Sequence, residues 1–220
     1  MSRVGQLTLR LFRRPRLTSH VIAICGLLKH NGDLRRRGWF RSFRTATPVD
    51  ADGEPLPWFT YAAIDFLEPR VRSDMRVFEY GSGHSTLWWA ARVASVTSYE
   101  HDRGWYERLL NTLPANVEYH HVRLTPAEKY AAGCAEAGVR FDIIVIDGRH
   151  RVACAKHAVS ALKEDGVIIW DNTNRSSYDE GCTGLMASGF KRIDFAGMGP
   201  ADFCGWTTSV FYRQQNCLGI

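Results

Sequence analysis

One short segment constrains the fold of this chain more than any other: residues 76–86, RVFEYGSGHST. An apolar pair leads into the glycine turn Gly81-Ser82-Gly83, and a helix-like segment follows. Strand, glycine turn and helix in this order let a nucleotide-like ligand bind backbone N–H groups at the N-terminus of a helix. Glycine permits the sharp turn and lets a ligand approach the backbone without a Cβ in the way. The segment therefore predicts a ligand site at the carboxyl end of the first strand of an α/β sheet.

The residues around this turn distinguish between cofactors. A dinucleotide site is typically G-x-G-x-x-G after the strand, whereas Thr86 stands three residues beyond Gly83. Glu79 comes just before the turn, where a carboxylate repels a pyrophosphate and attracts a cation. S-adenosylmethionine carries a sulfonium and an ammonium group and no phosphate. The segment therefore favours S-adenosylmethionine over NAD.

Composition favours one globular domain with an appendage. The 220 residues are 45% hydrophobic and 23% charged, which is ample for a sizeable core. The six cysteines form no C-x-x-C pair, and we find no secretory signal with a cleavage site. We therefore expect a reducing cytoplasm, without a zinc site or a disulfide framework. The longest apolar run near the N-terminus, residues 21–28, is too short to cross a bilayer.

Positive charge is concentrated near the N-terminus. Residues 1–44 contain eleven Lys or Arg and one acid, a net charge of +10, whereas the remainder carries a net charge of −5. We interpret residues 1–57 as a basic arm with a turn-rich connector, and residues 58–220 as the ligand-binding domain. One interpretation of the arm is a solvated basic segment. The other is a segment that binds an anionic surface. Leucines lie between its arginines, so the inner membrane is as plausible a surface as a polyanion. Nucleic acid is not expected, because no recognition motif accompanies the charge.

Strands and helices alternate through the larger segment. The runs IIVI and VIIW are typical of parallel strands buried on both faces, and the alternation implies a doubly wound α/β sandwich. The last two strands follow each other without a long helix, which fits an antiparallel hairpin at the sheet edge. The expected strands span 76–80, 96–100, 117–122, 141–146, 167–171, 190–194 and 207–213, and the expected helices span 58–67, 85–94, 103–113, 126–137, 152–162 and 178–188.

Candidate site residues lie at the carboxyl ends of these strands, where ligands bind in open α/β sheets. Glu100 ends the second strand, and its two oxygens suit a ribose diol. The alternative is an acid that balances the dipole of the next helix. The spacing from the glycine turn favours the ribose role.

The fourth and fifth strands end in Asp147 and in Asp171-Asn172. Three oxygen ligands on adjacent strand ends suit one hard cation such as Mg²⁺, which would bind a substrate hydroxyl and lower its pKa. Alternatively, these residues cap helices or fix turns. His150 is the best general-base candidate, because a histidine titrates near neutral pH; the alternative is a surface histidine at the start of a helix.

The segments EYGSGHST, SYEHD, FDIIVIDGRH and EDGVIIWDN resemble the class I S-adenosylmethionine-dependent methyltransferases over about residues 60–213. They resemble most the small bacterial members found among genes for polysaccharide and secondary-metabolite biosynthesis. The resemblance implies that residues 58–220 form a mostly parallel, seven-stranded Rossmann-like sheet with an antiparallel C-terminal hairpin. The residues expected at the cofactor are Glu79, Gly81, Ser82, Gly83, Ser85, Thr86, Glu100, His101 and Asp147.

The resemblance also implies catalytic roles. Asp147, Asp171 and Asn172 match the metal triad of the catechol O-methyltransferase-like branch. Some sugar O-methyltransferases pair a strand-four aspartate with a histidine three residues on, as Asp147 and His150 are paired here. Whether Mg²⁺ or the metal-free pair Asp147 and His150 carries the catalysis stays open at this point.

The predicted function is O-methylation of a small hydroxylated acceptor, such as a sugar or a secondary metabolite. We expect a cytoplasmic enzyme with a possible peripheral contact at an anionic inner membrane through the arm. One alternative is a nicotinamide-dependent oxidoreductase, against which the short glycine turn and Glu79 count. Another is a non-catalytic scaffold, since a fold alone does not grant activity. The sequence favours no particular acceptor or oligomeric state.

Overall fold

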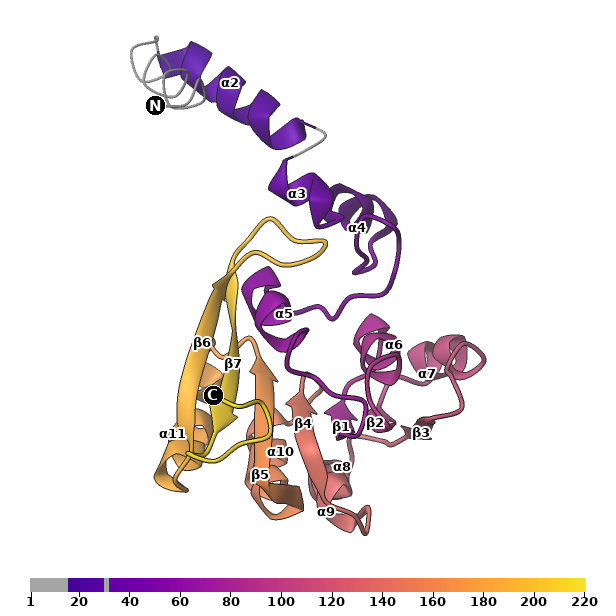
Figure 1. The fold of residues 1–220 in the computed structure, drawn as a ribbon. Coiled ribbons are helices and arrows are strands. Elements are labelled where there is room, and N and C mark those ends of the chain that lie inside the picture. Colours follow the sequence, from indigo (N-terminus) through magenta and orange to yellow (C-terminus); the bar gives the residue numbers. More distant parts are fainter. Residues whose placement is uncertain (1–15, 30–31) are drawn as a thin grey trace.

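The computed structural model of the chain describes residues 16–29 and 32–220. Its centre is a seven-stranded sheet in the order β3-β2-β1-β4-β5-β7-β6 (Figure 1). The first five strands are parallel, and β7 runs antiparallel to both β5 and β6. This confirms the predicted fold class. The strands are β1 Arg76–Tyr80, β2 Ser95–Glu100, β3 Val117–His121, β4 Phe141–Ile146, β5 Leu162–Asp171, β6 Lys191–Gly197 and β7 Trp206–Tyr212.

Most expected helices form, with two clear differences from the expected bounds. The first helix begins at residue 61 because Thr60 is its N-cap, where the Thr60 side chain accepts a hydrogen bond from the backbone of Ala63. The helix expected over 126–137 forms two short pieces. The helices are α2 Arg16–Leu28, α3 Asp33–Arg36, α4 Trp39–Thr45, α5 Tyr61–Leu67, α6 His84–Ala90, α7 Arg103–Leu110, α8 Ala127–Ala131, α9 Gly133–Glu136, α10 Arg151–Ala161 and α11 Asp179–Ala187, with a 3₁₀ turn at Ser176–Tyr178.

Both faces of the sheet are covered, which explains the uninterrupted apolar runs. Alternate side chains of one strand enter different cores: Ile143 packs with Trp88 and Trp89 on one face, whereas Ile144 packs with Trp170 on the other. Side chains in a strand alternate between faces, so a strand buried on both sides must be apolar throughout. The polar groups of the site consequently gather at the strand ends.

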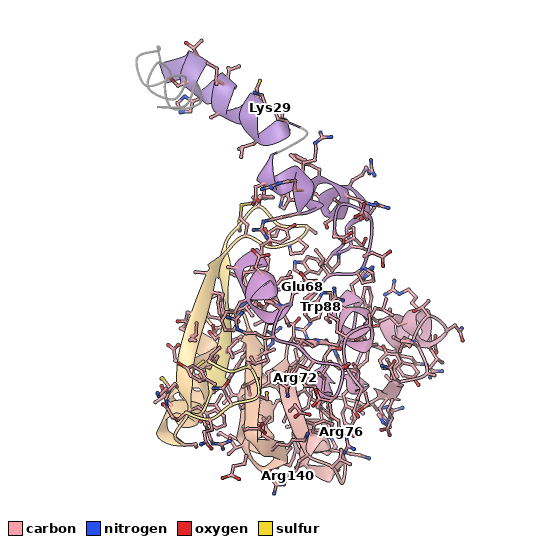
Figure 2. The ribbon with its side chains drawn as sticks, viewed as in Figure 1. Lys29, Glu68, Arg72, Arg76, Trp88 and Arg140 are labelled. Atoms are coloured by element: carbon pink, nitrogen blue, oxygen red, sulfur yellow. The ribbon has the colours of Figure 1, made fainter. Side chains whose placement is uncertain are left out.

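The segment before the sheet is partly docked on it. Arg37 donates to both carboxylate oxygens of Asp65 at 2.9 and 2.8 Å, and the Trp39 indole N–H donates to the carbonyl of Asp202 at 2.7 Å. By contrast, α2 extends away from the sheet, with Lys29 near its end (Figures 1 and 2). The division at residue 57 stays a prediction, and residues 1–15 and 30–31 of the expected arm lie outside the described residues.

Candidate active site

The glycine turn after β1 brings two strand ends into backbone contact. Gly81 has a φ of +87°, and a Cβ there would lie 3.0 Å from the Cα of Gly148, which follows β4. A Cβ on Gly148 would in turn lie 3.0 Å from the backbone nitrogen of Gly81. Both the left-handed conformation and this close crossing require glycine. We expected the missing side chain of Gly81 to make room for a ligand; the structure shows that it makes room for the neighbouring loop.

The side chain of Glu79 is buried under the glycine turn and stabilises it through hydrogen bonds. Its Oε2 accepts hydrogen bonds from the hydroxyls of Thr86 at 2.5 Å and Ser98 at 3.2 Å. The Thr86 hydroxyl also accepts from the backbone N–H of Gly83 at 3.1 Å. Glu79 is fully buried, and burial raises its pKa to about 8. At neutral pH the carboxyl group is therefore mostly neutral, and its role in this state is to shape the turn.

A cavity of about 500 Å³ opens at the carboxyl ends of β1, β2 and β4. Six of the nine expected cofactor residues line this cavity. The other three, Glu79, Gly83 and Thr86, do not line it. At Gly83 a Cβ would meet only the Trp105 ring, at 3.8 Å. The lining residues are Gly81, Ser82, Ser85, Glu100, His101, Asp102, Trp105, Arg108, Asp147, Gly148, Arg149, Arg151, Asn172 and Arg175.

Glu100 is buried, lines this cavity and already accepts four hydrogen bonds. Oε1 accepts from the backbone N–H groups of His101 and Asp102 at 2.7 and 2.8 Å. Oε2 accepts from the backbone N–H of Ser82 at 3.1 Å and from its hydroxyl at 2.8 Å. A carboxylate has about four acceptor positions, so a ribose hydroxyl would have to replace one partner. The Ser82 hydroxyl is the partner that can rotate away, since it has Tyr119 as an alternative at 2.7 Å.

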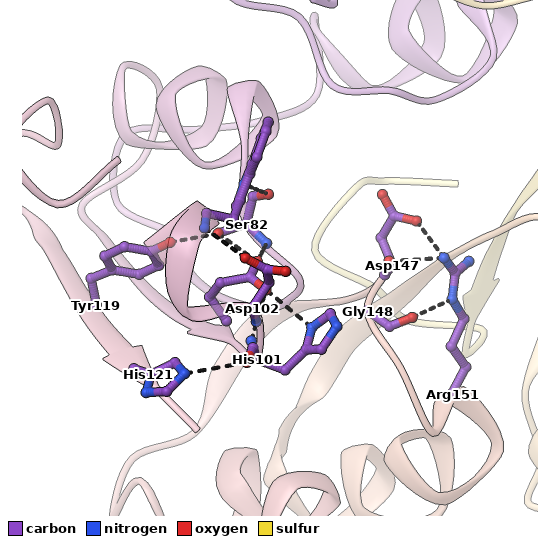
Figure 3. A network of polar contacts seen from close by, with 10 residues as sticks. Ser82, His101, Asp102, Tyr119, His121, Asp147, Gly148 and Arg151 are labelled. Atoms are coloured by element: carbon purple, nitrogen blue, oxygen red, sulfur yellow. Dashed lines mark hydrogen bonds and ion pairs between the residues drawn. The ribbon is translucent and has the colours of Figure 1, made fainter. Parts of the chain in front are cut away.

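Arg151 is the functional residue that the sequence analysis missed. Its buried guanidinium donates to the carbonyls of Gly148 and Asp147 and to Oδ1 of Asp147, at 2.8 to 2.9 Å (Figure 3). It also donates to the carbonyl of Asp171 at 2.6 Å and to Oδ1 of Asn172 at 3.3 Å. One side chain thus joins the ends of β4 and β5. The signal was present in DGRHR, where an arginine stands four residues after the aspartate at the start of a helix.

The expected metal triad does not fit a resident Mg²⁺. The guanidinium of Arg151 already binds side-chain oxygens of Asp147 and Asn172. Oδ1 of Asp171 accepts from the Trp206 indole N–H at 2.8 Å and the Thr208 hydroxyl at 2.5 Å. Within 16–29 and 32–220, no cluster of three His, Cys, Asp or Glu residues is placed to hold a metal. The interpretation of these strand-end residues as ligands is therefore replaced by an internal arginine network.

A second cavity, of about 410 Å³, adjoins the first and shares Asp147, Asn172 and Arg175 with it. Burial and the nearby charge of Asp147 raise the pKa of Asp171 to about 7. Burial also raises the pKa of Asp147, against the opposing effect of Arg151. The lining residues are Trp58, Asp147, Asp171, Asn172, Asn174, Arg175, Asp202, Cys204, Gly205 and Trp206.

His150 lies apart from both cavities. It is exposed, has a φ of +50°, and places its ring 6.3 Å from the ring of Tyr130, centroid to centroid. It lines neither of the two cavities. Asp147 is paired with Arg151 and not with His150. The structure therefore does not bring together the expected pair of Asp147 and His150.

Comparison with known proteins gives a partial family match and similar folds. Residues 78–173, from β1 to the loop after β5, match the family model of a methyltransferase domain. The fold is similar to that of precorrin-6y C5,15-methyltransferase from Geobacter metallireducens (12% identity, TM-score 0.55, covering 70% of this chain and 87% of that chain). It is also similar to a methyltransferase-like protein from Silicibacter pomeroyi (20%, 0.52, 74% and 91%) and to an rRNA methylase from Streptococcus thermophilus (13%, 0.51, 69% and 95%). Comparison with curated proteins gives no match.

These findings agree with the resemblance stated from the sequence: residues 78–173 match a methyltransferase domain, and the fold is similar to that of solved methyltransferases. The cavity combines part of the glycine turn, Gly81 and Ser82, with the carboxylate of Glu100 at the next strand end. The similar structures include an rRNA methylase, so the expected exclusion of nucleic acid is not supported.

The raised pKa of Glu79 predicts a pH-dependent stability. The folded state keeps this proton up to about pH 8, whereas the unfolded chain loses it near pH 4.5. Stability from this group is therefore present at low pH and is lost as the pH rises towards 8. Between pH 5 and pH 8 the free energy of unfolding of the wild type should fall by on the order of 3 kcal/mol relative to that of Glu79→Gln, whose side chain cannot ionise.

Urea unfolding of both proteins at several pH values measures this difference. Glu118→Gln, at an exposed carboxylate on β3, is the matched control and should follow the wild type. Parallel stability curves for the wild type and Glu79→Gln would show that Glu79 is ionised in the folded protein.

Proposed function

We propose that this methyltransferase domain methylates an oxygen atom of a small polyhydroxylated acceptor, such as a sugar, bound in the cavity lined by Trp58 and Trp206. The observation that carries the proposal is the junction of two cavities at Asp147. Because both cavities share this residue, a donor in one and an acceptor in the other would meet beside its carboxyl group. Holding two reactants in this way is a large part of what catalysis of a group transfer needs.

The acceptor cavity has the chemistry of a sugar site. Two indoles offer flat apolar surface for the C–H face of a sugar ring, while Asp202, Asn174 and Asp171 offer oxygens and an amide for its hydroxyls. The volume of about 410 Å³ is in the range of small-molecule sites. Trp206 is held in place because its N–H donates to Asp171. Polysaccharide or secondary-metabolite precursors are acceptors of this kind.

Residues of the two cavities would divide the work: those of the cofactor cavity would bind the cofactor, and carboxylates at the junction would accept a proton. S-adenosylmethionine supplies a methyl group on a sulfonium sulfur, which leaves as a neutral thioether. The Glu100 carboxylate would hold its ribose part, and its methionine part would lie beside Gly81 and Ser82, which line the same cavity. The carboxylates of Asp147 and Asp171 are placed to take the proton of the acceptor hydroxyl as the new C–O bond forms. Asp171 takes the role that we assigned to His150, because Asp171 lines the acceptor cavity.

Cofactor binding tests the class and the site together. S-adenosylhomocysteine should bind, and NAD should not. Glu100→Ala should weaken binding by about 1–3 kcal/mol, the usual loss for stranded polar groups. Ser82→Ala should bind at least as well as the wild type, because the ribose hydroxyl no longer competes with the serine hydroxyl for Glu100.

Calorimetry with S-adenosylhomocysteine measures these affinities, with Glu118→Ala as the control at a distant carboxylate. Preferential binding of NAD would favour an oxidoreductase. Unchanged affinity in Glu100→Ala would remove the carboxylate from the ribose site.

The pKa of Asp171 predicts the pH dependence of methyl transfer. A general base works in its deprotonated form, so kcat should rise as the pH passes about 7 and then level off. Asp171→Asn should lower kcat at least about 100-fold, the usual contribution of a positioned base, while keeping cofactor affinity. Asp165→Asn, an exposed site on the same strand, should leave the profile unchanged.

Methyl transfer to a panel of sugars, followed by the release of S-adenosylhomocysteine, gives these rates. If His150→Ala removes the pH dependence and Asp171→Asn retains it, the assignment of the base returns to the histidine.

We also propose that α2 docks on an anionic membrane surface. The structure describes α2 as a 13-residue helix with its large apolar side chains about half exposed, and isolated helices of this length are marginal in water. Arginines of α3 and α4 beside it supply the complementary charge. In the described parts of the chain no helix is long and apolar enough to cross a membrane. The exposed apolar residues are Val21, Ile24, Leu27 and Leu28, and the arginines are Arg35, Arg36, Arg41 and Arg44.

Vesicle co-sedimentation tests this contact. Binding to vesicles that contain phosphatidylglycerol should fall with added salt, and Ile24→Glu with Leu27→Glu should reduce it at least tenfold. Val139→Glu, at an exposed apolar residue remote from α2, should bind normally. Equal binding of neutral and anionic vesicles would contradict the electrostatic part of the proposal.

A further inference from the structure

A third cavity, of about 420 Å³, lies where the loop after β4 enters α10. Its lining is strongly basic and contains no acidic side chain. It shares four residues with the cofactor cavity. The lining residues are Gly148, Arg149, His150, Arg151, Val152, Ala153, Lys156, Arg175 and Tyr178.

Two of the four arginine and lysine side chains in this lining already have a partner for their positive charge. Arg151 binds Asp147 and backbone carbonyls, and Lys156 pairs with Glu180 at 3.0 Å. Arg149 and Arg175 are exposed, and within residues 16–29 and 32–220 their side chains form no hydrogen bond or ion pair. Two guanidinium groups without a hydrogen-bond partner in the described part of the chain thus border one cavity beside the proposed reaction site, and the charge of Arg175 also acts to lower the pKa of Asp147.

The position of Arg175 connects this basic cavity to the proposed chemistry. Arg175 follows the end of β5 and lines all three cavities, while Arg149 lines the cofactor cavity and the basic one. A molecule in the acceptor cavity can therefore extend past Arg175 towards Arg149. Guanidinium groups match phosphate oxygens with paired N–H donors, which makes a pair of free arginines well suited to a phosphate ester.

We propose that the acceptor carries a phosphate or diphosphate group, and that Arg149 and Arg175 bind this group in the basic cavity. The proposal rests on the proposed function, since it names the class of acceptor for the same site. A cofactor carboxylate alone does not account for the cavity, because Lys156 and Val152 line only the basic cavity and not the cofactor cavity. The phosphate would anchor the acceptor at a fixed distance from Asp147.

The test measures binding of inorganic pyrophosphate to the full chain saturated with S-adenosylhomocysteine, by calorimetry at low and moderate salt. The wild type should bind one pyrophosphate, with an affinity that falls as salt is added. The double variant Arg149→Gln with Arg175→Gln should bind at least tenfold more weakly and should keep its affinity for S-adenosylhomocysteine. Arg103→Gln with Arg123→Gln removes the same charge from exposed sites elsewhere and should behave as the wild type.

The outcomes separate this inference from the proposed function. Failure of the wild type to bind S-adenosylhomocysteine would refute the function itself. Normal S-adenosylhomocysteine binding without pyrophosphate binding, or with equal pyrophosphate binding in the double variant, would overturn the phosphate site alone. Loss of S-adenosylhomocysteine binding in the double variant would also overturn it, by assigning the arginines to the cofactor.

A phosphate ester can come from a soluble sugar phosphate or from a lipid headgroup, and competition distinguishes these sources. Glucose 1-phosphate should displace pyrophosphate if the acceptor is soluble. Vesicles of phosphatidic acid should displace it if the acceptor is linked to a lipid. Displacement by neither, at concentrations that saturate other phosphate sites, would count against a phosphate ester.

Discussion

The site depends on one buried guanidinium group. Arg151 binds the carbonyls at the ends of β4 and β5 and the side chains of Asp147 and Asn172, so two strand ends and the start of α10 are held by one residue. A buried charge of this kind is stable only when its hydrogen bonds are satisfied. The arrangement keeps two carboxyl groups, Asp147 and Asp171, close together at the junction of two cavities. Arg151 also binds side-chain oxygens of Asp147 and Asn172, two of the three residues expected to hold a metal ion.

Periodicity and strand-end chemistry made most of the fold predictable. The apolar runs of β4 and β5 identified a sheet buried on both faces, and the glycine turn identified its first strand. The pairing of Arg151 with Asp147 had a local signal in DGRHR, but its contacts with Asp171 and Asn172 were not predictable, because they join strand ends that are far apart in sequence. The direction in which His150 points depends on a left-handed backbone conformation at the start of α10, which no sequence pattern revealed. Three-residue spacing alone therefore did not reveal that Asp147 pairs with Arg151.

Glu79 shows that burial can change the charge state expected of an acidic residue. From the sequence it is a carboxylate that attracts a cationic ligand. In the fold it is enclosed by Thr86 and Ser98, and the cost of burying its charge favours the neutral acid. The glycine turn is thus held by a hydrogen-bonded chain from Glu79 through Thr86 to the backbone of Gly83.

The hydrogen bond from Trp39 to the carbonyl of Asp202 has a consequence for the evolution of specificity. Asp202 lies on the loop between β6 and β7 and lines the proposed acceptor cavity. The helix α4, which carries Trp39 and precedes the sheet, therefore supports one side of that cavity. Changes in the N-terminal segment can therefore reshape the acceptor cavity while the sheet and the cofactor residues stay the same. Under the proposed function, acceptor choice can diverge through residues that precede the sheet in the sequence.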